Sequence, residues 1–403
     1  MGSVPGQGSD KLCRLLRLRR GGLLQQWLGS LSRTRIGSRR AAASVAIHPF
    51  RVTHRHFYPV PTILIASYLE PEYVDRIRAV DARLTVHYHP ELLYTPRYPA
   101  DHWPGEFTRT AEGETRWRAM LAESEILFDF DKSNAADLAT LAPKLRWIQA
   151  TSAGIGEFMA KHSYATQMPN VTFTTCSGVH AQPLAEWCVL VMLAFHKKFL
   201  ETLADQRRKH WERFATADLK DQTLVIVGMG NIGTEVARMG KVFGMRTIGV
   251  KRTIAGIVPA DLHLDALYGP HDLHVALKEA QNLVLITPRT KETEQMIGAR
   301  ELAMLPKGAL FINIGRGALV DEPALIASLR SGHLRGAGLD VFETEPLPPS
   351  SPFWEMDNVI VCPHSASTAD RENERITDIF CDNLRRYLDV KPLLNVYDRA
   401  LGF

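Results

Sequence analysis

The feature that most constrains the fold is a short apolar run that leads directly into a glycine-rich turn. Residues 223–240 read TLVIVGMGNIGTEVARMG, in which Leu224 to Val227 are typical of a buried strand and Thr234 onward of a helix. The glycines between them follow the spacing Gly-x-Gly-x-x-Gly. In a strand–turn–helix context this spacing predicts a dinucleotide-binding unit, with a glycine turn in a ligand-free sheet as the alternative.

Each glycine of the motif has a distinct expected role. Gly228 permits the tight turn, Gly230 lets the backbone approach a pyrophosphate, and Gly233 lets helix and strand meet. The helix N-terminus then faces the phosphates, so Asn231 and Ile232 are expected among the cofactor contacts.

The end of the next expected strand, RTIGV, bears on the choice between NAD and NADP. An acidic residue normally closes this strand and binds the ribose 2′-hydroxyl. Here the strand ends in Lys251, Arg252 and Thr253, and no acidic residue occurs between Glu235 and Asp261. Two cations and a hydroxyl suit a 2′-phosphate, so the sequence favours NADP(H), with NAD(H) as the alternative if the cations only face solvent.

Two further expected strands deliver polar residues to the edge where open α/β sheets bind ligands. Phe311 to Ile314 is followed by Gly315-Arg316-Gly317, which places one arginine on a bare turn. The planar guanidinium of arginine matches a carboxylate. Ala337 to Val341 forms the second strand, and Asp340 and Glu345 bracket the loop that leaves it.

A third strand, in NVIVCPHSAST, ends just before His364. A histidine at the carboxyl end of a strand with an acid close by is a typical arrangement for a general acid or base. A lone histidine is more often structural, but the expected proximity of Arg316 and Glu345 favours a catalytic role here.

The rest of the chain alternates between strand and helix patterns, which predicts parallel sheets covered by helices. This alternation begins at Thr62, whereas residues 90–113 show no period and indicate a loop or insertion. We expect one long helix from Pro183 to about His210, and a final amphipathic helix over 371–388 that returns to the first domain.

Charge is distributed very unevenly along the chain. Residues 1–57 contain eleven Lys or Arg and a single acid, Asp10, whereas the remaining 37 basic and 43 acidic residues leave the body mildly acidic. The leader therefore resembles a transit peptide and predicts mitochondrial import, with a cytoplasmic or plastid protein, a basic tail or a mis-assigned start as alternatives. The body gives no indication of nucleic-acid binding.

Composition also sets aside several other classes of protein. No stretch approaches 18 uncharged apolar residues, so we expect no membrane insertion. The five cysteines form no CxxC pair, and the histidines form no metal-binding pattern, so we predict neither a disulfide framework nor a metal site.

Taken together, the motifs GMGNIG, NIGRGALVDEPAL, GLDVFETEPLP and PHSAST resemble the D-isomer-specific 2-hydroxyacid dehydrogenase family, over essentially all of the chain from Thr62. The resemblance implies two Rossmann-like, doubly wound α/β domains, with the cofactor domain inserted into a discontinuous substrate domain. On this pattern we assign 58–177 plus 371–403 to the substrate domain and 178–370 to the NAD(P)-binding domain. The family also implies a homodimer.

The resemblance further assigns roles to individual residues. Arg316, Glu345 and His364 match the catalytic positions, and TSAGIGEF matches the loop whose amides take the substrate carboxylate. The substrate-binding set is then Ala153, Gly154, Ile155 and Arg316. The cofactor-binding set is Gly228, Gly230, Asn231, Ile232, Gly233, Lys251, Arg252, Thr253, Thr287, Pro288, Ile314, Gly315, Arg316, Asp340 and His364.

These residues predict reduction of a small 2-keto acid, or the reverse oxidation of a D-2-hydroxy acid. Arg316 would hold the carboxylate and His364 would donate a proton, with its pKa raised by Glu345. A cofactor-sensing corepressor on the same fold is the alternative from another class, and a phosphite-type or phosphoglycerate-type dehydrogenase is the alternative among enzymes. His102, Trp103 and His180 are left without a catalytic role.

Overall fold

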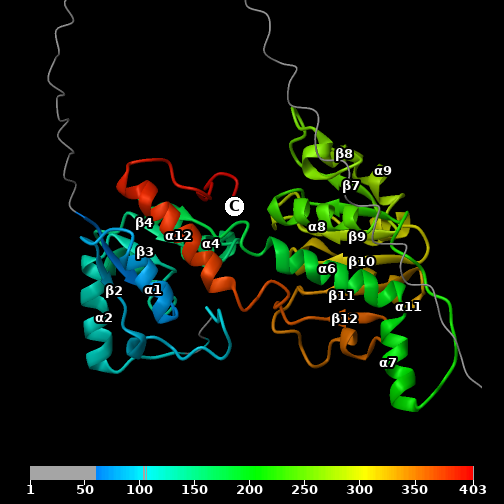
Figure 1. The fold of residues 1–403 in the computed structure, drawn as a ribbon, viewed down its shortest axis with the longest axis horizontal. Helices are drawn as coiled ribbons and strands as arrows, with labels where there is room; N and C mark the ends of the chain where they lie inside the picture. Colours follow the sequence, from blue (N-terminus) through cyan, green and yellow to red (C-terminus); the bar gives the residue numbers. More distant parts are fainter. Residues whose placement is uncertain (1–59, 103–104, 106, 403) are drawn as a thin grey trace, which may run out of the picture. The chain divides into compact units, whose positions relative to one another are not determined.

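Two parallel sheets organise the protein (Figure 1). The computed structural model describes residues 60–102, 105 and 107–402, so the basic leader predicted at 1–57 lies outside the described residues. The first sheet has the strand order β2-β1-β3-β4-β5 and the second has the order β12-β11-β10-β9-β6-β7-β8. Both are doubly wound orders, in which ligands bind at the carboxyl ends of the strands. The predicted fold class is therefore confirmed.

The first sheet is built from alternating apolar residues that supply a core on each face. Leu64 and Leu127 point into one core with α2, while Ile63 and Ile126 point into the other with α1 and α12. The elements are β1 (Thr62–Ile65), α1 (Pro71–Arg78), β2 (Thr85–His87), α2 (Ala111–Glu123), β3 (Ile126–Phe128), α3 (Leu138–Leu141), β4 (Trp147–Gln149), α4 (Gly156–Lys161), α5 (Tyr164–Gln167), β5 (Thr172–Thr174) and α12 (Glu372–Leu388). The final helix thus returns to the first sheet, as the sequence predicts.

The second sheet has the same two-sided arrangement. Val225 and Leu283 face one core with α9 to α11, whereas Leu224 and Val284 face the other with α6 and α8. Its elements are α6 (Ala181–His196), α7 (Phe199–Arg208), β6 (Thr223–Val227), α8 (Asn231–Val242), β7 (Arg246–Val250), β8 (Ala266–Tyr268), α9 (Leu273–Leu277), β9 (Asn282–Leu285), α10 (Ala299–Met304), β10 (Ala309–Asn313), α11 (Glu322–Arg330), β11 (Leu334–Leu339) and β12 (Val359–Val361).

The long helix expected from Pro183 to about His210 is divided into two. The break falls between α6 and α7, where Lys198 adopts the left-handed conformation with φ of 51°. The two halves also differ in burial, since α6 buries eight residues and α7 none. The sequence contains no glycine or proline at this break, so no residue there indicates that a helix ends. For this reason the sequence predicted one continuous helix.

The segment 90–113, expected to be irregular from its lack of periodicity, is irregular only as far as Thr110, because α2 begins at Ala111. A 3-10 turn over Pro90–Leu92 is the only regular element before Ala111 among the residues described there. The irregular part ends where the Thr110 side chain caps α2 by accepting a hydrogen bond from the Gly113 amide at 3.1 Å. Among the described helices, none is long and apolar enough to cross a membrane.

Candidate active site

The carboxyl edge of the second sheet gathers most of the site residues predicted from the sequence. Each follows a strand of this parallel sheet directly or within a few residues. They are Gly228 after β6, Lys251 after β7, Thr287 after β9, Arg316 after β10, Asp340 after β11 and His364 after β12.

The glycine-rich turn has the geometry of a phosphate cradle. A Cβ at Gly228, where φ is 114°, would lie 2.8 Å from a backbone atom of Ile286, and one at Gly233 would lie 2.1 Å from the Gly228 carbonyl oxygen. Packing therefore requires both glycines. At Gly230 a Cβ would meet no protein atom within 4 Å, so the protein itself does not require glycine there.

This difference fits a bound dinucleotide, since a side chain at Gly230 would project into space beside the N-terminus of α8. That helix starts at Asn231 without a side-chain cap, so its first amide groups are available to an anion. The residues present therefore fit the nicotinamide dinucleotide that the motif predicts. When bound, this cofactor supplies the hydride for the reaction.

The end of β7 places cationic residues next to this turn. Lys251 donates a hydrogen bond from Nζ to the carbonyl oxygen of Met229 at 2.7 Å, so its ammonium group lies against the glycine-rich turn. Arg252 and Thr253 follow as exposed residues. The structure thus places the two cationic residues predicted for the end of β7 beside the glycine-rich turn, and Lys251 contacts this turn directly.

His364 and Glu345 form a hydrogen-bonded pair at the same edge. The distance between His364 Nδ1 and Glu345 Oε2 is 2.8 Å, and the other oxygen of Glu345 accepts from the amide of Phe342 at 3.0 Å. His364 itself has a positive φ of 52°, and its amide donates to the carbonyl oxygen of Asp340 at 2.9 Å. Backbone contacts thus fix both members of the pair.

The pair shifts the pKa of each partner. The hydrogen bond to Glu345 raises the pKa of His364 above its ordinary value, against the opposing effect of burial. For Glu345, burial acts to raise the pKa, but the hydrogen bond from His364 and the amide of Phe342 outweigh it and the net shift is downward. Both shifts favour a charged imidazolium–carboxylate pair, which is suited to proton donation.

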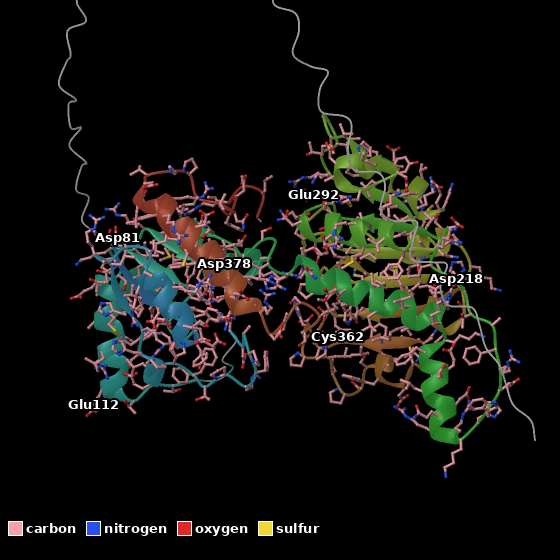
Figure 2. All side chains as sticks on the ribbon, viewed as in Figure 1. Asp81, Glu112, Asp218, Glu292, Cys362 and Asp378 are labelled. Carbon is pink, nitrogen blue, oxygen red and sulfur yellow. The ribbon has the colours of Figure 1, made fainter. Side chains whose placement is uncertain are left out.

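Asp340 is buried beneath this pair. Its Oδ1 accepts hydrogen bonds from the amides of Ser365 and Ala366 at 2.8 and 3.0 Å. Burial raises the pKa of Asp340 despite these bonds. Cys362, labelled in Figure 2, is the first residue after β12. Asp340 therefore anchors the turn that carries His364.

Arg316 lies next to the loop that follows β4. A Cβ at Gly154 would come within 2.2 Å of Arg316 Nη2, so the guanidinium packs directly against this glycine. The other end nitrogen, Nη1, donates to the carbonyl oxygen of Gly315 at 2.7 Å. Asn313 secures the turn by accepting from the amide of Gly315 and donating to the carbonyl of Arg316. The structure thus brings the predicted arginine and the predicted loop together.

The remaining histidines have different surroundings. His180 is buried and pairs through Nε2 with Glu372 at 3.0 Å, which supports a structural role. His102 is held at both ring nitrogens by Ser67 and Asn373. Trp103 lies outside the described residues. Within the described ranges, no group of three or more His, Cys, Asp or Glu is placed to hold a metal ion.

Comparison with known proteins identifies the family. The model of the D-isomer-specific 2-hydroxyacid dehydrogenase NAD-binding domain matches residues 189–366. A glyoxylate reductase from Aeropyrum pernix is 33% identical over 274 residues, which cover 66% of this chain and 80% of that protein. The chain belongs to the D-isomer-specific 2-hydroxyacid dehydrogenase family.

Other relatives agree with this assignment. A glyoxylate/hydroxypyruvate reductase B from Citrobacter koseri is 32% identical over 277 residues, covering 67% of this chain and 83% of the relative. The solved structure of a D-isomer-specific 2-hydroxyacid dehydrogenase from Xanthobacter autotrophicus, in complex with NADPH and MES, has a TM-score of 0.68 and 27% identity. It covers 85% of this chain and 100% of its own.

The family assignment makes the chain a dehydrogenase of 2-hydroxy acids that uses a nicotinamide cofactor. These named relatives are reductases and dehydrogenases, so they lend no support to the corepressor alternative. The individual residue roles remain predictions, although the geometry places the proposed catalytic groups at the carboxyl edge of the second sheet.

One group of residues was not predicted from the sequence, namely the polar network of Ser67 and Tyr94 around His102. The only sequence signal was a histidine in an aperiodic, proline-rich segment.

Proposed function

We propose that this dehydrogenase is a reductase that transfers hydride from NADPH to glyoxylate or another small 2-keto acid, giving the corresponding 2-hydroxy acid, which is the D isomer wherever C2 is a stereocentre. The observation that carries the proposal is the His364–Glu345 pair, 2.8 Å apart. Because the pKa of His364 is raised, the protonated imidazole persists to higher pH than in a free histidine, and in that form it can act as an acid.

The protein's own groups have complementary tasks in this reaction. Arg316 and the amides of Ala153 to Ile155 hold the substrate carboxylate, because a guanidinium fork and backbone N–H groups both suit an anion. His364 donates a proton to the keto oxygen as negative charge develops there, and Glu345 holds the imidazole in place. The protonated form of His364 is the one that serves reduction, and the neutral form serves the reverse oxidation.

The preference for NADPH rests on the end of β7. No carboxylate follows this strand, and Arg252 and Thr253 are exposed beside the turn that Lys251 contacts. A ribose 2′-phosphate would find hydrogen-bond donors there, whereas a 2′-hydroxyl would lack its usual acidic partner.

A steady-state assay of the full chain tests both parts of the proposal. Glyoxylate, hydroxypyruvate, pyruvate and phenylpyruvate would each be offered with NADPH and with NADH. We expect turnover of at least one small keto acid and a clear preference for NADPH. Preference for NADH would refute the cofactor assignment, and tight cofactor binding without any turnover would refute the reductase.

We also propose that the basic leader directs the protein to mitochondria. The support is compositional, since residues 1–57 carry eleven basic residues and one acidic residue. A fluorescent protein fused behind residues 1–57 should enter mitochondria. A diffuse cytoplasmic signal, or import into plastids, would contradict this.

Finally, we propose a homodimer formed through the region of α7. Its support is apolar exposure, because Leu190, Phe199 and Trp211 are 57%, 50% and 93% exposed and α7 buries no residue. Sedimentation equilibrium should give twice the chain mass for the wild type and a shift to monomer for Trp211→Asp. A monomeric wild type would contradict the proposal.

A further inference from the structure

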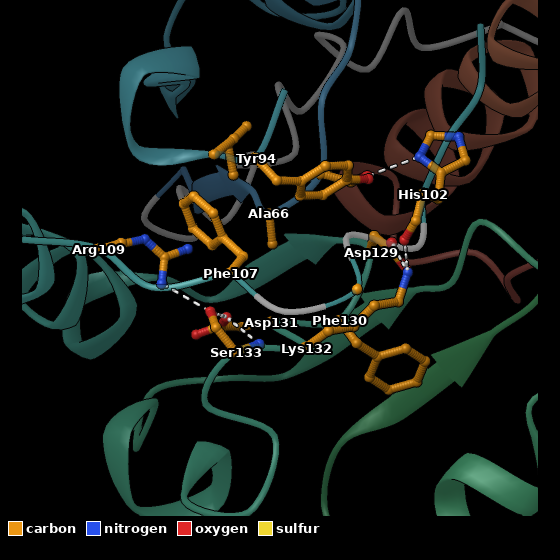
Figure 3. A pocket seen from close by; sticks show the side chains of 13 residues that line it. Ala66, Tyr94, His102, Phe107, Arg109, Asp129, Phe130, Asp131, Lys132 and Ser133 are labelled. Atoms are coloured by element: carbon orange, nitrogen blue, oxygen red, sulfur yellow. Dashed lines mark hydrogen bonds and ion pairs between the residues drawn. The ribbon is translucent and has the colours of Figure 1, made fainter. Parts of the chain in front are cut away.

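A small cavity lies at the carboxyl edge of the first sheet, and its lining includes none of the predicted catalytic residues Arg316, Glu345 and His364 (Figure 3). Its volume is about 50 Å³, and its described lining residues come from three places. Ala66 and Ser67 follow β1, the run from Asp129 to Ser133 follows β3, and Tyr94, His102 and Phe107 come from the aperiodic segment.

The cavity adjoins the loop expected to take the substrate carboxylate. Asp129 Oδ1 accepts a hydrogen bond from the amide of Thr151, two residues before Ala153, at 3.4 Å. Phe130 belongs to the same apolar cluster as Ile155, which lies within that loop. A keto acid held there by its carboxylate would therefore have this cavity close to the remainder of its carbon chain.

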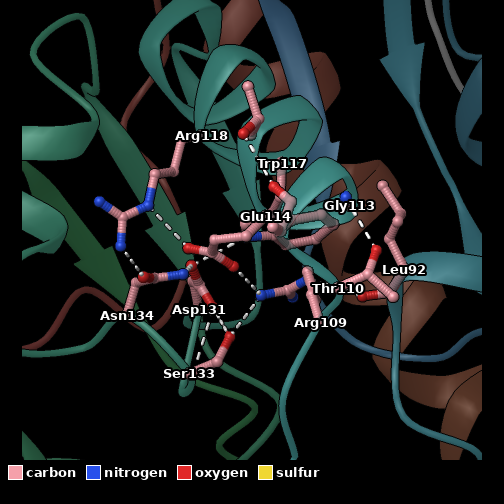
Figure 4. A network of polar contacts seen from close by, with 12 residues as sticks. Leu92, Arg109, Thr110, Gly113, Glu114, Trp117, Arg118, Asp131, Ser133 and Asn134 are labelled. Atoms are coloured by element: carbon pink, nitrogen blue, oxygen red, sulfur yellow. Dashed lines mark hydrogen bonds and ion pairs between the residues drawn. The ribbon is translucent and has the colours of Figure 1, made fainter.

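The charged groups at the cavity are already engaged by the protein. Arg109 donates to the carbonyl of Leu92 and to Ser133, both at 2.7 Å, pairs with Glu114, and stacks on Trp117 with its Cζ 4.0 Å from the ring centroid (Figure 4). Lys132 pairs with Asp129 at 2.8 Å and donates to the carbonyl of His102. These contacts make a second carboxylate or a phosphate a poor fit for the cavity.

The direction of each hydrogen bond around His102 can be deduced by starting from the carboxylate of Glu70. The Glu70 carboxylate can only accept, so the Asn373 amide nitrogen must donate to it, at 2.8 Å. The amide oxygen of Asn373 then faces His102 Nε2 at 2.8 Å and needs a proton on that nitrogen. Burial lowers the pKa of His102, which favours the neutral ring with Nδ1 as an acceptor.

This tautomer leaves two oxygens at the cavity wall without a donor between them. Ser67 gives its single hydroxyl proton to His102 Nδ1, 2.7 Å away. Tyr94 gives its own proton to the carbonyl oxygen of Asp101. The Ser67 Oγ and Tyr94 Oη atoms are nevertheless only 3.1 Å apart. Because both hydroxyl protons are used elsewhere, the two oxygens face each other as acceptors with no hydrogen atom between them.

We propose that this Ser67–Tyr94 oxygen pair is a specificity site that accepts a hydrogen bond from a hydroxyl group on C3 of the 2-keto acid. The inference rests on the proposed reductase function and refines its substrate class to 3-hydroxy-2-keto acids, of which hydroxypyruvate is the smallest. A donor placed between the two oxygens satisfies both acceptors, whereas a methyl group satisfies neither.

The size of the cavity agrees with a small substituent. An apolar cavity of about 150 Å³ holds a benzene ring, and this one measures about 50 Å³. A hydroxymethyl group suits such a volume better than the ring of phenylpyruvate does. Tyr94 and Phe107, whose ring centroids are 6.4 Å apart, close one side of the space.

The test compares hydroxypyruvate with pyruvate, which differ only in the C3 hydroxyl, using the full chain and one saturating cofactor. The quantity measured is the ratio of their kcat/KM values. We expect Tyr94→Phe and Ser67→Ala each to lower this ratio about tenfold, as expected for loss of one hydrogen bond to a buried group. Tyr164→Phe is the matched control, because it also removes a tyrosine hydroxyl that bonds a carbonyl, that of Ala135, but does not line the cavity.

Three results would overturn the inference. An unchanged ratio in both Tyr94→Phe and Ser67→Ala would exclude recognition of the C3 hydroxyl by this pair, and thermal unfolding of each variant would establish that it folds. An equal loss in Tyr164→Phe would show a general effect of destabilisation. A wild type that reduces glyoxylate but does not distinguish hydroxypyruvate from pyruvate would refute the specificity site alone, whereas failure to reduce any of the three would refute the proposed function.

Discussion

Replacing Gly154 by alanine perturbs the expected carboxylate site by a calculable amount. A Cβ at this position would lie 2.2 Å from Arg316 Nη2. Ordinary contact between such atoms requires ~3.5 Å, so the guanidinium must withdraw by roughly 1 Å. The contacted atom is the far end of a flexible side chain, so we expect the fold to tolerate the change and the position of Arg316 to shift.

A displacement of this size has a large kinetic effect if Arg316 orients the substrate. A misplacement of about 1 Å in a reacting complex costs on the order of 100-fold in rate. We therefore expect Gly154→Ala to lower kcat/KM for glyoxylate by about 100-fold, with a melting temperature close to that of the wild type. Steady-state kinetics and thermal unfolding of the same preparations measure both quantities.

Gly269→Ala is a suitable control for this experiment. Its added Cβ would meet only Ile254 Cδ1 at 3.7 Å, an ordinary contact far from Arg316 in the sequence. We expect this variant to keep wild-type kinetics. A Gly154→Ala enzyme that stays within about threefold of wild-type efficiency would refute the assignment of Arg316 and this loop to the substrate carboxylate.

Three further predictions follow from the same geometry. Glu345→Gln removes the group that raises the pKa of His364, so the loss of kcat/KM at high pH should begin at lower pH than in the wild type; an unshifted pH profile would exclude the pairing as the cause. Arg252→Ala should raise the KM for NADPH at least about tenfold and leave that for NADH nearly unchanged, and an equal change for both cofactors would count against 2′-phosphate binding. Gly317→Ala should lower the melting temperature strongly, because its Cβ would lie 1.9 Å from the backbone of Phe342, and a normal melting temperature would contradict this packing.

The second sheet was predictable from the sequence because its signals are local. Three glycines at a characteristic spacing predict the turn after β6. The strand RTIGV was predicted with the same bounds that β7 has in the structure. His364 and Glu345 were likewise expected to pair, since both follow strands of one parallel sheet. The structure shows this pair and the direction of the His364 pKa shift that the pair was expected to cause.

The polar network of the first sheet could not be predicted in this way. It joins Glu70 to Asn373, which are separated by 303 positions, and Ser67 to His102 across an aperiodic segment. No spacing rule connects residues that come together only through the return of α12 to the first sheet. The break between α6 and α7 was not predicted for a local reason. Lys198 adopts a left-handed conformation there, and this conformation is usually indicated in a sequence by glycine or asparagine rather than by lysine.

The most direct test of the central claim is the effect of Arg316→Ala on glyoxylate reduction by the full chain at saturating NADPH. The control is Arg300→Ala, an exposed arginine on α10. If Arg316 binds the substrate carboxylate, its variant should lose on the order of 100-fold or more in kcat/KM, while Arg300→Ala stays near the wild type. Near-normal efficiency of Arg316→Ala on keto acids would contradict the account.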